Sequence, residues 1–149
     1  MELTFEMFPG RTLSLFLYRD VSFGTIASLR SQLSSRTLEV ALLNPRLVAS
    51  PLCIRAAANK ALLAQSTGAK VSQSLHSDFI RCLHSGKNIG ESLRVLGPSM
   101  ESKGGDLMIA AFDVLKEEGA SGGGGGGCSL SALRALVSDG KLESVEQYF

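Results

Sequence analysis

The chain has 149 residues, 44% of them hydrophobic, which suits one domain built around one buried core. Fifteen basic and fourteen acidic side chains leave a net charge of +1, so no overall field attracts the protein to nucleic acid or to a membrane. Three widely spaced cysteines predict free thiols rather than a disulfide framework or a zinc site. We expect a protein of the cytoplasm and nucleus without metal or cofactor.

The first forty residues predict strands around a helix. Apolar residues alternate over 3–7 and over 13–17, on either side of a Pro-Gly pair, which predicts two strands joined by a turn. The alternation also argues against a signal peptide, and no apolar stretch reaches the roughly 20 residues of a membrane span. Residues 22–33 have the spacing of a helix, and residues 38–43 are typical of a short buried strand.

The middle of the chain predicts mainly helices. Ser50-Pro51 is a typical helix start, and the alanine-rich segment after it ends at Gly68, a plausible C-cap. Residues 70–75 suggest a brief strand, and residues 77–83 suggest a short helix.

A further helix begins at Asn88. This residue and Glu91 have the spacing of a capping box, and Ile89, Leu93 and Leu96 form an apolar stripe that we expect to be buried.

The last third of the sequence contains one strong strand signal. Residues 106–113, DLMIAAFD, form a continuous apolar run, which indicates a strand covered on both faces in the middle of a sheet. Residues 130–137 suggest a helix, and residues 142–149 suggest the start of another. The expected fold is α/β, with a mixed sheet flanked by helices. Its parts are residues 1–115, a flexible Gly-rich loop at 116–128, and residues 129–149 as the remainder of the same domain.

No group of residues predicts catalysis. Cys82 and His84 lie two positions apart on the predicted helix and so point to different faces, which favours a packed thiol and an exposed imidazole over a nucleophile and its base. The six-glycine run lacks the lysine and hydroxyl of a phosphate-binding loop. The protein is therefore expected to be no enzyme and to bind no small-molecule substrate.

Two places carry polar residues that could bind a partner. Asn59 and Lys60 interrupt an apolar helix, with Arg55 one turn earlier, although an exposed stripe with an extended lysine is the simpler interpretation. Lys87 and Asn88 precede a helix start, where a cation and free N–H groups could receive a phosphate, although an ordinary turn and N-cap is the simpler interpretation.

Four segments carry a family resemblance. They are FEMFPGRTLSLFLYRDV, LLNPRLVASPLCIRAAANKALL, SDFIRCLHSGKNIGESLRVLG and GGDLMIAAFDV, of which LLNP, AANKAL and NIGESLRVLG are the most specific parts. In this order they resemble the kinase-binding small subunit of the KEOPS/EKC complex, the PRPK-binding protein family, over about residues 1–115.

This resemblance implies a fold and a function. The family fold is α/β, and the family has no enzymatic activity. It works in the complex that makes threonylcarbamoyladenosine at position 37 of tRNA, where it binds a small atypical kinase/ATPase and helps recruit tRNA by the single-stranded 3′ CCA end. Carried over to matched positions, the resemblance places tRNA binding at Asn59, Lys60, Lys87, Asn88, Ile89 and Arg94.

Two departures from the family pattern leave an alternative open. Relatives continue past the segment matching VEQYF into a further helix that this chain lacks, and the glycine run replaces a more ordinary connection. If that helix contributes to kinase binding, the docking of the kinase is in doubt and apolar surface around Tyr148 and Phe149 is left uncovered. The alternative is a truncated protein-interaction module that regulates the kinase without a role in tRNA binding.

Overall fold

The computed structural model describes residues 1–35, 39–69, 74–84, 88–98, 105–114, 134–135, 137 and 140–149. This part of the chain is one α/β domain, as the sequence predicts. Its elements in chain order are β1 (Glu2–Thr4), β2 (Thr12–Val21), α1 (Phe23–Ser34), β3 (Ala41–Leu43), the 3-10 helix η1 (Pro45–Leu47), α2 (Pro51–Thr67), α3 (Leu75–His84), α4 (Ile89–Leu96), β4 (Gly105–Phe112), β5 (Lys141–Glu143) and α6 (Val145–Tyr148).

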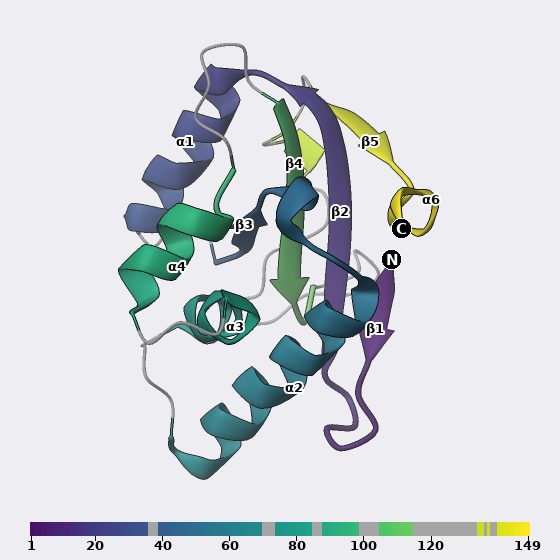
Figure 1. Ribbon diagram of the computed structural model, residues 1–149, viewed down its shortest axis with the longest axis vertical. Helices are drawn as coiled ribbons and strands as arrows, with labels where there is room; N and C mark the ends of the chain where they lie inside the picture. The colour runs from purple at the N-terminus through teal and green to yellow at the C-terminus, as the bar shows by residue number, and fades with distance from the viewer. Residues whose placement is uncertain are drawn as a thin grey trace, which may run out of the picture.

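The described strands form a five-stranded sheet in the order β1-β2-β4-β3, with β5 also paired to β2. The sequence predicted a mixed sheet, but each pairing between described strands is antiparallel. Strands β2 and β3 do run parallel to one another, since both are antiparallel to β4. The parallel pair is not adjacent because β4 is inserted between its two members (Figure 1).

Helices cover both faces of this sheet (Figure 1). Helix α1 packs on one face through Ile26 and Leu29, and helices α2 and α3 pack on the other face. Strand β4 packs against the helices on both faces of the sheet, because its successive side chains belong alternately to the two buried clusters on those faces. Its six residues from Leu107 to Phe112 are all buried, so the prediction of a central strand is confirmed.

Helix α2 has the start and end that its sequence predicts. The Ser50 hydroxyl accepts a hydrogen bond from the Cys53 amide at 3.4 Å, and Pro51 is the first helical residue. Gly68 ends the helix with a φ of 75°, a conformation that glycine adopts without strain. The buried face contains alanines at 57, 58 and 61, whose small side chains suit the close packing of this helix against α3.

Two predicted elements differ in the structure, and a third lies mostly outside the described part. Strand β3 is shorter than the predicted 38–43, and residues 36–38 lie outside the described part. Leu75 begins α3 instead of ending a strand, and residues 70–73 are outside the described part as well. Of the predicted helix at 130–137, residues 134–135 are helical and residue 137 lies in a turn, whereas residues 130–133 and 136 lie outside the described part.

The prediction of a helix over 142–149 is wrong for its first residues. Lys141–Glu143 form β5 instead, with Leu142 opposite Tyr18 of β2. The Arg19 guanidinium holds this strand in place. Its Nε donates to Glu143 at 2.8 Å, and its Cζ lies over the Tyr148 ring, 5.4 Å from the ring centroid. Phe149 is 40% exposed at the end of α6.

Two glycines provide a matched test of the packing. A Cβ at Gly140 would lie 2.9 Å from Cγ2 of the buried Val21, whereas nothing lies within 4 Å of a Cβ at Gly24 in α1. We expect Gly140→Ala to lower the free energy of unfolding by about 1–3 kcal/mol through overpacking. Gly24→Ala should raise it by about 0.5–1 kcal/mol, because alanine favours the helix. Urea denaturation followed by circular dichroism measures both, and equal effects of the two substitutions would contradict the described packing.

Candidate functional site

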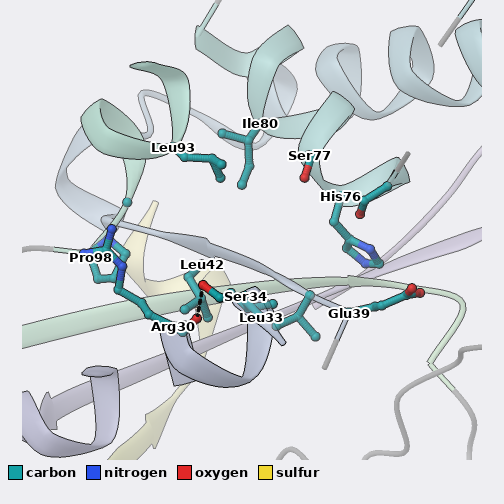
Figure 2. Close-up of a pocket in the computed structure, with 13 residues that line it drawn as sticks. Arg30, Leu33, Ser34, Glu39, Leu42, His76, Ser77, Ile80, Leu93 and Pro98 are labelled. Atoms are coloured by element: carbon teal, nitrogen blue, oxygen red, sulfur yellow. Dashed lines mark hydrogen bonds between the residues drawn. The ribbon is translucent and has the colours of Figure 1, made fainter. Parts of the chain in front are cut away.

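A groove of about 450 Å³ opens along the outer edge of the sheet (Figure 2). It lies between α1 on one side and α3 and α4 on the other, with β3 at its base. Its apolar walls face one another, with Leu33 and Leu42 on one side and Ile80 and Leu93 on the other. A groove of this volume with apolar walls and a few polar groups is typical of a binding site.

Leu93 corrects one expectation from the sequence. The stripe on α4 was expected to be buried, and Leu96 is, but Leu93 is 39% exposed because it points into the groove (Figure 2). The side chain of Ile89 lies outside the described part.

The two ends of the groove carry opposite charges. The Arg30 side chain extends from α1 toward Pro98 at one end, and Glu39 lies near His76 at the other (Figure 2). Within the described residues, no ion pair is formed by either Arg30 or Glu39. The groove therefore presents a cation and an anion separated by apolar side chains.

His76 is a buried histidine with a structural role. Its Nε2 accepts a hydrogen bond from the backbone N–H of Phe112 at 3.0 Å. Strand β3 is too short to provide a partner opposite Phe112, so the imidazole takes the place of a strand carbonyl. Burial lowers the pKa of His76 to about 4, an effect that Asp113 opposes weakly, and the ring is therefore neutral at pH 7.

The second histidine is also held by a hydrogen bond. His84 Nδ1 lies 3.0 Å from the Ser92 hydroxyl, which links α3 to α4. The imidazole is partly buried and not exposed as expected, whereas Cys82 packs against the core as predicted. The described part of the chain contains no group of three His, Cys, Asp or Glu residues able to hold a metal ion. None of its helices is long and apolar enough to span a membrane.

The residues expected to bind tRNA on α2 lie at its surface. Lys60 is exposed and Asn59 is partly exposed. Leu63, one turn further along the helix, is 47% exposed, so that a cation, an amide and an apolar side chain lie close together. Arg55 differs, because its Nη1 donates to the Thr4 carbonyl at 2.7 Å and thereby ties α2 to β1.

The remaining expected residues lie on or before α4. The Asn88 side chain caps this helix, because its Oδ1 accepts from the Gly90 and Glu91 amides at 2.9 and 3.4 Å. The simpler interpretation of Asn88 as an N-cap is thus confirmed, and these two N–H groups are already engaged. Arg94 is exposed, and Lys87 lies outside the described part.

Helix α3 separates the two groups of expected residues, because α2 and α4 pack on different sides of it (Figure 1). Asn59 and Lys60 therefore do not share one helix surface with Asn88 and Arg94. The groove at β3 was not predicted from the sequence, since its lining comes from segments between residues 30 and 98 that only the fold brings together. An apolar residue exposed on an otherwise regular stripe, such as Leu93, becomes visible only in the structure.

A protein-family model described as kinase binding protein CGI-121 matches residues 18–119. The match covers more than half of the chain. It includes the whole lining of the groove as well as each residue expected to bind tRNA.

The buried His76 predicts how stability changes with pH. In the unfolded chain this histidine takes up a proton near pH 6.5, whereas in the folded protein it does so only near pH 4. The free energy of unfolding should therefore fall as the pH falls from 6.5 to 4, by about 3 kcal/mol from this residue alone. His76→Gln keeps a hydrogen-bond acceptor that does not titrate.

Urea denaturation at pH 7 and at pH 4.5 measures this effect. The loss of stability between the two pH values should be smaller in His76→Gln than in the wild type. His84→Gln, on the same helix, serves as the control and should keep the wild-type loss. An equal loss in all three proteins would show that His76 does not carry the predicted proton linkage.

Proposed function

The chain belongs to the CGI-121 family of kinase-binding proteins, and on this basis we propose that it is a non-catalytic subunit of the KEOPS/EKC complex. In this role it binds the atypical small kinase/ATPase of the complex. It also helps recruit tRNA by its 3′ CCA end for threonylcarbamoylation of adenosine 37. The proposal places the protein in the cytoplasm and the nucleus, where it acts without a metal or cofactor.

The observation that carries this proposal is the family match from β2 through β4. The matched region includes the central strand, the helices on both faces and the groove. The groove and the residues expected to bind tRNA therefore lie within the part of the chain that the kinase-binding family model matches.

The surface of α2 supports the tRNA part of the proposal. Proteins hold single-stranded nucleic acid with cations along the backbone and with apolar surfaces beneath the bases. Exposed Lys60 and Leu63 supply one of each, and Asn59 adds a side-chain amide. Arg94 on α4 adds a second exposed cation on the other side of α3.

The histidines support a non-catalytic role. A general base needs an imidazole that can reach a proton on a nucleophile. His76 instead accepts from the Phe112 backbone and has a pKa of about 4, and His84 pairs with Ser92.

One observation favours the alternative function, a protein-interaction module that regulates the kinase without serving tRNA. The amides of Gly90 and Glu91 at the start of α4 are already engaged by Asn88. A phosphate at this helix start would have to displace the Asn88 side chain. The two candidate functions differ in whether this chain binds tRNA.

Charge reversal provides the test. The full chain should bind intact tRNA more tightly than tRNA without its 3′ CCA. Lys60→Glu combined with Lys87→Glu should weaken binding by about tenfold or more, and the slope of log K against log salt should become shallower by about 1–1.5, since each lost phosphate contact removes about 0.7. Filter binding between 50 and 200 mM salt measures both quantities.

Lys141→Glu is the matched control, because this exposed lysine lies on β5, away from α2 and α4 (Figure 1). It should leave the CCA preference intact and the slope within experimental error. Indifference to the CCA end would overturn the tRNA proposal and favour the alternative. An unchanged slope in the double variant would remove Lys60 and Lys87 from the site.

A further inference from the structure

The base of the groove is a buried strand, which limits what can bind there. Val40 and Leu42 at this base are each 4% exposed, so their backbone offers little to a partner chain. A ligand would contact the side chains of the walls and of the two ends instead. The volume of about 450 Å³ falls within the roughly 300–1,000 Å³ of pockets that hold small molecules.

One deeply placed polar group in the groove lacks a partner. His76 lines the groove and is 8% exposed. Its Nε2 accepts from the Phe112 N–H, so the neutral ring carries its proton on Nδ1. Among the described residues, no acceptor is found for this Nδ1–H. A donor at this depth is costly to leave unpaired, and an acceptor on a ligand would remove that cost.

Two further polar groups lie at the same end of the groove. The Ser77 hydroxyl points into it, and the Glu39 carboxylate lies beyond His76 (Figure 2). Neither side chain has a hydrogen-bond partner in the described part of the chain. A neutral hydroxyl or amide on a ligand could accept from His76 and donate to Glu39. An ammonium has no lone pair for the His76 N–H, and a carboxylate would be repelled by Glu39.

The opposite end of the groove selects an anion. Among the described residues that line the groove, Arg30 is the one lysine or arginine, and its guanidinium forms no ion pair there. A guanidinium pairs with a carboxylate through two parallel hydrogen bonds, and one carboxylate matches its single charge. A dianionic phosphate would leave one negative charge unmatched.

The walls between the two ends are apolar. Leu33 and Leu42 face Ile80 and Leu93 across the groove (Figure 2). An aliphatic chain would bury its surface between these side chains, and burial of apolar surface favours binding.

We propose that the groove binds an elongated small organic acid. The carboxylate of this ligand pairs with Arg30, its aliphatic body lies between the apolar walls, and a hydroxyl or amide at its far end meets His76, Ser77 and Glu39. The proposal adds a small-molecule ligand to a protein whose sequence predicts none. It does not depend on the proposed function, and it leaves the outer surface of α2 for tRNA.

Three related compounds test the chemistry of the ligand. Calorimetry with the full chain measures binding of ω-hydroxydecanoate, of its methyl ester and of decanedioate. The hydroxy acid should bind at millimolar concentration or below. The ester lacks the charge for Arg30, and decanedioate brings a second carboxylate to Glu39, so each should bind about tenfold more weakly or worse.

Matched substitutions assign the two ends of the groove. Arg30→Gln should weaken binding of ω-hydroxydecanoate by about tenfold, whereas Arg46→Gln, at an exposed position outside the lining, should bind within about twofold of the wild type. Glu39→Gln should abolish the preference for the hydroxy acid over decanedioate, and Glu6→Gln, on an exposed turn, should keep it. Circular dichroism verifies the folding of each variant.

The histidines locate the ligand without any substitution. The chain has two histidines, so their ring nitrogens are readily assigned in a long-range ¹H–¹⁵N NMR spectrum. Saturating ω-hydroxydecanoate should shift the Nδ1 resonance of His76. His84, which pairs with Ser92 and lies outside the lining, is the internal reference and should not shift.

Each other outcome overturns the proposal. Absence of binding at millimolar ω-hydroxydecanoate would do so, and so would binding that leaves His76 unshifted. Equal affinities of Arg30→Gln and Arg46→Gln would remove Arg30 from the site and contradict the assigned orientation of the ligand. If the His76 resonance instead shifts with protein concentration in the absence of any acid, the occupant is a second copy of the chain and the proposal is wrong.

Discussion

The burial of β4 on both faces is the constraint on which the rest of the structure depends. Leu107, Ile109 and Ala111 contact the layer of α1, and the residues between them contact the layer of α2 and α3. A strand buried in this way can satisfy its backbone groups only through neighbouring strands on both sides. Strand β2 does so along most of one side, whereas β3 is too short to do so along the other.

The shortness of β3 accounts for the most unusual features of the molecule. Beyond its end, the Phe112 amide would be buried without a partner, and His76 provides the acceptor at the cost of a strongly lowered pKa. The same short strand forms the edge at the base of the groove, with α1 and the pair α3 and α4 rising on either side (Figures 1 and 2). The buried His76 and the groove at the edge of the sheet therefore both follow from the short length of β3.

Most of the fold could be predicted because its signals are local. The continuous apolar run of β4, the Ser-Pro start of α2 and the Asn88 cap are each determined by residues next to one another in the sequence. The direction of the strands could not be predicted, since the insertion of β4 between β2 and β3 depends on contacts far apart in the chain. Strand β5 was missed for the same reason, because a three-residue strand with exposed side chains has no pattern of its own.

The site was predictable only in part. Exposure of Lys60 and Arg94 agrees with a surface role, but sequence spacing could not reveal that α3 lies between their two helices.

The distance in sequence between β2 and β4 also affects how the protein is made. Strand β2 is complete at Val21, yet β4 ends roughly ninety residues later, which at about 5–20 residues per second takes roughly 5–20 seconds of synthesis. Throughout that interval the apolar side chains of β2 emerge before their main partner exists, so the newborn chain needs protection from premature association until the central strand arrives.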